Sequence, residues 1–180
     1  MQGMVDRMLS AGTGTKDGKK AARTRRQRGY QWEDTIVKRF NTAQDWKAFR
    51  LGSPSIGLPD VLAVNTPKKT IFVLEAKSGT VTVLPVPAKQ IQRCITWIQM
   101  FDLYKKHKVI LAFKFLSKKR IGIDRYEGRT LREFFKVWDE TMPPVNCYCT
   151  YDGQVFTRNG KKTRLNLKEY KMPFKTWQPA

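Results

Sequence analysis

The stretch from Pro59 to Lys77, which reads PDVLAVNTPKKTIFVLEAK, decides the fold of this 180-residue chain. Two strongly apolar runs, residues 60–65 and 70–77, flank Thr-Pro-Lys-Lys at 66–69. Runs of this length around a turn sequence predict a β-hairpin. Apart from the turn, nearly every residue from 61 to 74 is apolar or small. Strands of this composition are typically buried on both faces, so we expect the hairpin inside the core.

Charged residues gather at the open end of this hairpin. If the two strands pair symmetrically about the turn, Asp60 faces Glu75, and Lys77 lies on the same face two residues further. Opposed carboxylates repel each other unless a cation lies between them, and charges are costly to bury in an apolar hairpin. Mg²⁺ fits, because it takes oxygen ligands and needs only one or two protein carboxylates. A lysine beside it can orient or help deprotonate an attacking water. The alternative is a purely structural ion cluster.

The segments on either side of the hairpin predict a compact α/β core. Apolar residues at helical spacing predict helices over residues 30–43 and from Pro87 to about residue 105. Residues 46–51 and 108–116 are expected to be strands, and residues 52–59 form a Gly/Ser/Pro loop. The expected order is therefore α-β-β-β-α-β. Glu33 lies on the apolar face of the first helix, where it is either a capping carboxylate or a further member of the site.

Both ends of the chain extend beyond this core. Residues 1–28 contain eight basic residues and almost no periodic apolar pattern, so we expect a disordered basic arm. Residues 117–180 are expected to form an extension packed on the core of residues 29–116. Thr130 and Glu133 have the spacing of a capping box, which predicts a helix over residues 131–138. Three short strands separated by Asp152-Gly153 and Asn159-Gly160 are expected after Pro143-Pro144.

The composition favours a nucleic-acid partner. The chain has 35 Lys plus Arg against 15 Asp plus Glu, a net charge of +20, while 41% hydrophobic residues suffice for a core. No apolar run is long enough to cross a bilayer, and the first ten residues lack an apolar signal region. We therefore expect an intracellular protein, cytoplasmic or associated with the nucleoid, and no membrane partner. One histidine and three scattered cysteines leave carboxylates, lysine and a hard metal for any hydrolytic chemistry.

Pro59-Asp60 followed by Glu75-Ala76-Lys77 resembles the motif of the PD-(D/E)xK nuclease superfamily. Within it, four further segments resemble the archaeal-type Holliday-junction resolvases: residues 28–33, 50–53, 88–89 and 112–115. The resemblance covers about residues 28–116. It implies a restriction-endonuclease-like mixed sheet, with the C-terminal helix and β-meander as an addition to that fold. It also implies a homodimer that acts on branched DNA through two active sites.

The resemblance assigns roles to individual residues. Asp60 and Glu75 would bind Mg²⁺, for which Mn²⁺ can substitute, with help from the Ala76 carbonyl and Glu33, and Lys77 would be the catalytic lysine. Ser53 would be the loop serine near the scissile phosphate, with Ser55 as its rival because the loop is longer than the usual pattern. DNA contacts are expected from Arg28, Arg50, Ser55, Lys89 and Arg93.

Together these observations predict a metal-dependent, structure-selective DNA endonuclease that resolves four-way (Holliday) junctions by paired nicks. The alternatives are another PD-(D/E)xK DNA nuclease, such as a restriction-like or repair nicking enzyme, and a non-catalytic basic protein that binds nucleic acid. Trp97, Met100 and Tyr104 would give the second helix another apolar face. That face is either the dimer interface or is covered by the C-terminal extension.

Overall fold

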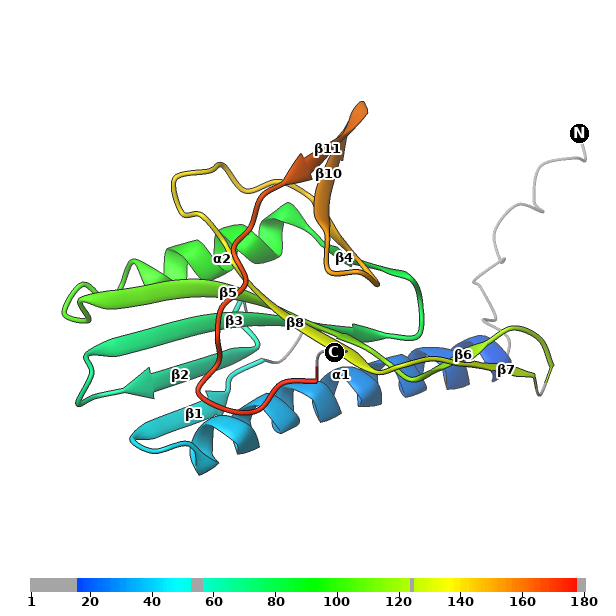
Figure 1. Cartoon of the computed structure of the whole chain (residues 1–180), viewed down its shortest axis with the longest axis horizontal. Helices are drawn as coiled ribbons and strands as arrows, with labels where there is room; N and C mark the ends of the chain where they lie inside the picture. Colours follow the sequence, from blue (N-terminus) through cyan, green and yellow to red (C-terminus); the bar gives the residue numbers. More distant parts are fainter. Residues whose placement is uncertain (1–15, 53–56, 124, 178–180) are drawn as a thin grey trace, which may run out of the picture.

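The chain folds as a mixed α/β protein with two helices and eleven strands among the residues that its computed structural model describes, which are 16–52, 57–123 and 125–177 (Figure 1). The elements in chain order are α1 (Lys16–Thr42), β1 (Trp46–Arg50), β2 (Val61–Asn65), β3 (Thr70–Gly79), β4 (Val83–Val86), α2 (Ala88–Ile98), β5 (Lys106–Phe115), β6 (Lys118–Arg120), β7 (Tyr126–Gly128), β8 (Arg132–Val137), β9 (Cys147–Thr150), β10 (Val155–Asn159) and β11 (Lys161–Leu165).

A five-stranded mixed sheet forms the centre, in the order β1-β2-β3-β5-β8. β3 and β5 are parallel, and the other neighbours are antiparallel. The predicted hairpin is confirmed, because β2 pairs with β3 in the expected register, with Asn65 opposite Thr70 and Ala63 opposite Phe72. This register places the end of β3 that carries Glu75 beside the residue that precedes β2.

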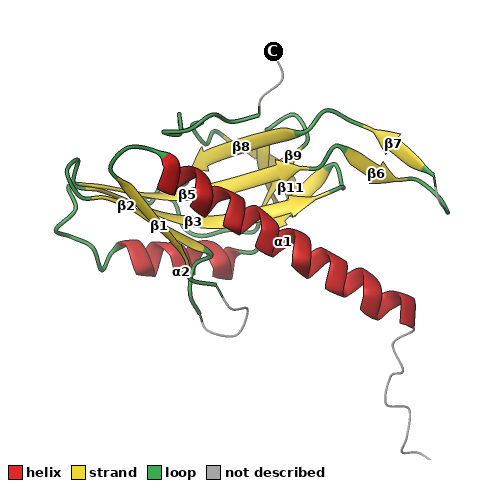
Figure 2. Cartoon of the chain, turned by 90° about the horizontal axis from the view of Figure 1, so that it is seen from below, coloured by secondary structure: helices red, strands yellow, loops and turns green. Residues whose placement is uncertain are grey.

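The two faces of this sheet are covered by different elements (Figure 2). Ile71 and Val73 of β3 pack on the face that α2 covers, whereas Phe72 and Leu74 pack on the face of α1. This alternation follows from the two-residue period of a strand. The odd-numbered Glu75 and Lys77 therefore belong to the α2 face of the sheet.

A second sheet packs on the α2 side, in the order β11-β10-β9-β4. β9, β10 and β11 are the three short strands expected after Pro143-Pro144, and they are confirmed. β4 is an addition to the expected order, and it pairs antiparallel with β9. β6 and β7 form a separate two-stranded hairpin. No helix in the described part of the chain is long and apolar enough to cross a membrane.

Three sequence predictions are wrong in their secondary structure. Residues 131–138 form strand β8 instead of a helix, because residues 132–137 pair with β5 and complete the central sheet. Glu133 is consequently not part of a capping box. Residues 16–28 belong to α1 instead of a disordered arm, since this stretch is rich in Lys, Arg, Ala and Gln, which favour helices. Residues 1–15 lie outside the described part.

The third difference concerns α2, which ends at Ile98 instead of near residue 105. Met100 and Tyr104 therefore do not lie on the helix with Trp97, and the additional apolar helix face is not formed. Trp97 and Tyr104 pack against the α2-side core, while Met100 is 61% exposed. The division of the chain into units at residues 28 and 116 stays a prediction, although β8 joins residues beyond 116 to the central sheet.

Candidate active site

The predicted charges do meet at the end of β3. Asp60 directly precedes β2, and its backbone carbonyl accepts a hydrogen bond from Leu51 N at 3.0 Å. Val61 pairs with Leu74, so continuing the register by one residue puts Asp60 opposite Glu75. The Glu75 side chain has no exposed surface, and Lys77 remains partly exposed. Because the strands fix their spacing, the predicted juxtaposition follows from the hairpin alone.

Two cations hold the buried carboxylate of Glu75. Lys77 Nζ lies 2.6 Å from Glu75 Oε1, and Arg93 NH2, from α2, lies 2.7 Å from Glu75 Oε2. Asp60 Oδ2 accepts a hydrogen bond from Ala76 N at 2.7 Å, and Asp60 Oδ1 lies 4.0 Å from Arg93 NH2. Arg93 was predicted to contact DNA, and the structure adds that it bridges the two site carboxylates.

Glu33 reaches the same site from the other side of the sheet. It lies on α1, is only 8% exposed, and its Oε2 is buried without a hydrogen-bond partner in the described structure. Burial, followed by the negative charge of Asp60, raises the pKa of Glu33 to about 7. Arg50 opposes this shift. Glu33, which faces inward from the apolar side of α1, is therefore close enough for the charges of Asp60 and Glu75 to raise its pKa.

Asp60 shows the same electrostatic crowding. Burial and the charge of Glu75 raise the pKa of Asp60 to about 6, against the hydrogen bond from Ala76 N and the charges of Lys77 and Arg93. Carboxyl groups with raised pKa values gathered in one place are typical of functional sites, although structural clusters also produce them. Here burial is the largest cause of both shifts, and the nearby cations do not cancel it.

A divalent cation fits this donor set in chemistry and charge. Glu33 Oε2 is buried without a hydrogen-bond partner among the described residues, and Asp60 Oδ1 has only the long contact of 4.0 Å to Arg93 NH2 among the contacts described above. Hard cations prefer such oxygen ligands. Lys77 and Arg93 each donate a hydrogen bond to one carboxylate oxygen of Glu75. A cation bound by Glu75 would therefore share one of these oxygens with Lys77 or Arg93. As arranged in the described residues, no group of three or more His, Cys, Asp or Glu side chains could hold a metal ion.

The remaining predicted residues are those expected to contact DNA and the two candidate loop serines. Lys89 is exposed in the first turn of α2. Arg50 lies 3.5 Å from Asp34 and stacks over the ring of Tyr30 at 5.0 Å. The Arg28 side chain is exposed, and its backbone carbonyl accepts a hydrogen bond from Ser78. Ser53 and Ser55 lie outside the described residues, so the choice between them stays a prediction.

A second ion cluster, which the sequence analysis missed, lies around Glu133 of β8. Glu133 is fully buried, and Arg39 of α1 binds both of its carboxylate oxygens at 2.6 and 3.1 Å. Lys114 of β5 lies 3.7 Å away and stacks over the Trp32 ring at 4.9 Å. The available signal was a lysine inside the apolar run of residues 109–116, which requires a buried partner.

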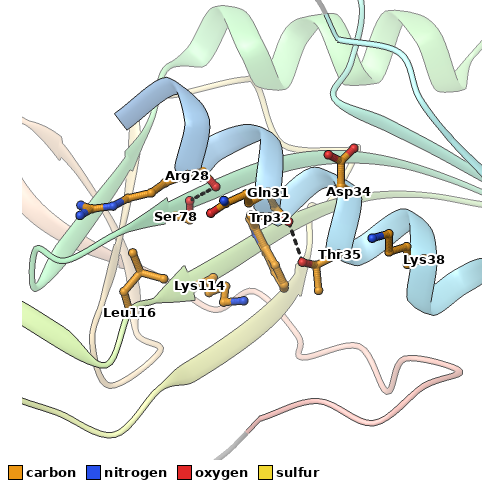
Figure 3. Close-up of a pocket in the computed structure, with 9 residues that line it drawn as sticks. All are labelled: Arg28, Gln31, Trp32, Asp34, Thr35, Lys38, Ser78, Lys114 and Leu116. Carbon is orange, nitrogen blue, oxygen red and sulfur yellow. Dashed lines mark hydrogen bonds between the residues drawn. The ribbon is translucent and has the colours of Figure 1, made fainter. Parts of the chain in front are cut away.

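A cavity of about 500 Å³ lies beside this cluster, between α1 and the ends of β3 and β5. Figure 3 shows the residues that line it. It is lined by Arg28, Gln31, Trp32, Asp34, Thr35, Lys38, Ser78, Lys114 and Leu116. Three of these residues are cationic and one is acidic. Neither Glu33 nor the Asp60–Glu75 pair lines it, so this cavity is separate from the carboxylate site.

The chain matches no protein-family model and no curated protein. Among solved structures it is similar to Hjc of Archaeoglobus fulgidus, a Holliday junction resolvase from an archaeal hyperthermophile. The two share 15% identity at a TM-score of 0.46, over 69% of this chain and 85% of that chain. The structural overlap is loose, so a function has to be inferred from the residues of the site.

Proposed function

We propose that this protein is a divalent-metal-dependent DNA endonuclease whose active site is formed by Asp60, Glu75, Lys77 and Glu33. The observation that carries the proposal is the gathering of Asp60, Glu75 and Glu33 at the end of β3, beside Lys77, Arg93 and Arg50, with the pKa values of Glu33 and Asp60 raised to about 7 and about 6. In a stability cluster the ion pairs would hold the carboxylates ionised at neutral pH, whereas here burial and repulsion keep the pKa values of two of them raised.

The residues of the chain divide the chemistry among themselves. When bound at Asp60 and Glu75, a divalent cation supplies a water of lowered pKa and offsets charge on a phosphate. Ala76 N fixes the orientation of Asp60. Lys77, partly exposed beside Glu75, is placed to orient the attacking water or to donate to a phosphate oxygen. Glu33, with a pKa near neutrality, is suited to accept a proton during the reaction.

The basic composition supports DNA as the substrate. A net charge of +20 favours a polyanion, because binding releases condensed counterions. We further propose the four-way junction as the preferred substrate, on the resemblance of residues 28–33, 50–53 and 88–89 to resolvase segments. Each chain carries one such site, so paired cuts on opposing strands require two chains, and a two-fold dimer is the commonest closed arrangement.

The deciding experiment incubates the full chain with a four-way junction and with a duplex of matching arms, each with Mg²⁺ or with EDTA. We expect cleavage only with Mg²⁺, and faster cleavage of the junction. Asp60→Asn should be inactive, whereas Asp102→Asn is the matched control, because Asp102 is an exposed carboxylate in the turn after α2.

Each result selects one candidate. Equal cleavage of junction and duplex would favour a restriction-like or nicking nuclease over a resolvase. Tight, salt-sensitive DNA binding without cleavage under any divalent cation would leave a non-catalytic binding protein. Sedimentation of the DNA-free protein at micromolar concentration tests the dimer, and a strict monomer that stays monomeric on the junction would exclude the resolvase.

A further inference from the structure

The β6–β7 hairpin projects from the end of the central sheet as a ribbon of its own. Its strands pair only with each other, with Lys118 opposite Gly128, and Ile121 N donates to Arg125 O at 3.0 Å. Figures 1 and 2 both show it extending beyond the body of the molecule. A lone two-stranded hairpin is marginally stable in water, so this element is expected to gain stability from a partner.

The apolar side chains of this hairpin face water. Ile121 is 55% exposed, Ile123 is 85% exposed and Tyr126 is 60% exposed. A cluster of large apolar side chains this accessible, at the end of a projecting element, is typical of an interaction surface. The described structure contains nothing that covers them.

Basic residues flank the apolar end. Lys118 begins β6, and Arg125 precedes β7, and both are exposed. Cations beside an aliphatic end fit an anionic partner that also offers an apolar interior. A DNA duplex has this combination, since its phosphates are outside and its stacked bases inside, and aliphatic wedges are known to enter between base steps. A two-stranded ribbon is also narrow enough to enter a major groove.

The hairpin lies at the same end of the sheet as the carboxylates. β3 and β5 are parallel, with Glu75 beside Leu111 and Gly79 beside Phe115, and β6 begins three residues after β5 ends. At about 3.3 Å per residue, the ten residues from the level of Glu75 to Ile121 span at most about 33 Å. The hairpin therefore lies within about one helical turn of DNA from the carboxylates.

We propose that the β6–β7 hairpin is a DNA wedge, in which Ile121 and Ile123 insert between base pairs while Lys118 and Arg125 contact the flanking phosphates. This inference rests on the proposed function, because it takes the bound duplex from the nuclease site. The wedge separates or unstacks bases near the cut, and a branched substrate, whose bases are easier to unstack at the branch point, is the natural one for it.

The test uses the full chain in EDTA with junctions that carry 2-aminopurine at successive positions along one arm. The parent protein should raise the fluorescence several-fold at one position, because the probe brightens when it is unstacked. The Ile121→Ser/Ile123→Ser variant should lose this rise and bind about tenfold more weakly. Leu103→Ser is the matched control, since Leu103 is 91% exposed in the turn between α2 and β5, and it should behave as the parent.

A second variant tests the phosphate contacts independently. Lys118→Gln/Arg125→Gln should reduce the slope of log affinity against log salt by about 2, one for each lost phosphate contact. Unchanged unstacking in the isoleucine variant would overturn the wedge. A shift from dimer to monomer in that variant without DNA would also overturn it, by showing an interface between two copies.

The parent's cleavage, measured in Mg²⁺ with the same junctions, separates the two proposals. Cleavage without unstacking rejects the wedge and leaves the nuclease, whereas unstacking without cleavage under any divalent cation rejects the nuclease and supports the wedge.

Discussion

Two fully buried glutamates, Glu75 and Glu133, lie on neighbouring parts of one sheet and are surrounded differently. Arg39 donates two hydrogen bonds to the Glu133 carboxylate, and Trp177 N donates a third at 3.2 Å. Lys114 Nζ lies 3.7 Å from Glu133 Oε1. The Arg39 guanidinium is in turn stacked 5.8 Å from each of two aromatic rings. The buried carboxylate of Glu133 is therefore paired with two cations, Arg39 and Lys114.

Around Glu75 the carboxylates are more crowded. Arg93 is shared between Glu75 and Asp60, and burial together with a neighbouring carboxylate raises the pKa of both Asp60 and Glu33. The comparison teaches that burial and ion pairing alone do not distinguish a structural cluster from a candidate active site. The distinguishing feature is the raised pKa of Glu33 and of Asp60, which the nearby cations do not cancel.

The difference between the two regions is tested most directly by removing one carboxylate from each of them. If the proposed function holds, Asp60→Asn should lower the cleavage rate by about 1,000-fold. The proposed metal would lose a ligand, and the transition state would lose its charge stabilisation. DNA affinity should stay the same or rise, since a negative charge is lost. Rates are measured under single-turnover conditions, and near-parental cleavage would refute the role of Asp60.

Glu133→Gln should act on stability instead. Breaking a buried ion pair from one side typically costs about 3–5 kcal/mol, and here it leaves Arg39 and Lys114 without their counterion. Urea unfolding measures the loss, and cleavage per folded molecule should remain at the parental level. A stable but inactive Glu133→Gln protein would instead place the second cluster in the catalytic machinery.

The pH dependence of stability should report these raised pKa values directly. The folded pKa values of Glu33 and Asp60, about 7 and about 6, lie above the ordinary values of 4.5 and 3.8. The folded state therefore binds more protons than the unfolded state between pH 4 and 7, so the free energy of unfolding falls as pH rises through this range. In EDTA we expect a fall of roughly 5 kcal/mol from these two groups.

Glu33→Gln is the control for this titration, and it should make the fall distinctly shallower. Urea unfolding at half-unit steps of pH measures both proteins. A stability that rises from pH 4 to 7 in both, with equal slopes, would show that the carboxylates near Glu75 are not strained by repulsion.

The smallest effect expected is stabilisation by the cation itself. A ligand at ten times its dissociation constant stabilises the folded state by about 1.4 kcal/mol. Mg²⁺ should therefore raise the free energy of unfolding of the parent at pH 7.5, and Ca²⁺ provides a second hard cation. Asp60→Asn should lose this response while Glu133→Gln keeps it. An equal response in both variants would indicate nonspecific binding to the surface.

The sequence predicted the Glu75 site well because strand geometry is rigid. A symmetric turn fixes which residues oppose, and the two-residue period fixes their face, so Asp60, Glu75 and Lys77 follow from the hairpin. The approach of Glu33 from the α1 side and the bridging role of Arg93 depend on how the helices pack. No local pattern encodes that packing.

The Glu133 region was missed for a related reason. Leu131, Phe134, Phe135 and Trp138 have helical spacing, but pairing with β5 makes the segment a strand that buries Glu133 and Phe135 on one face. A short segment can satisfy both the helical period of 3.6 residues and the strand period of two, and pairing with a neighbouring strand then decides which forms. In the same way, a high density of Lys and Arg suggested disorder in residues 16–28, where the good helix formers among them instead extend α1.

β8 is the outer strand of the central sheet, yet residues 132–137 come after β5 and the β6–β7 hairpin. A ribosome releases the chain in order, so β5 has an unpaired edge throughout the synthesis of the segment between them. Glu133 N donates to Trp177 O at 2.8 Å, and its carboxylate accepts from Trp177 N, so the buried charge is fully paired only once residue 177 has emerged. The nascent protein therefore cannot complete its fold from the N-terminus, and chains stalled before β8 should be protease-sensitive clients of chaperones.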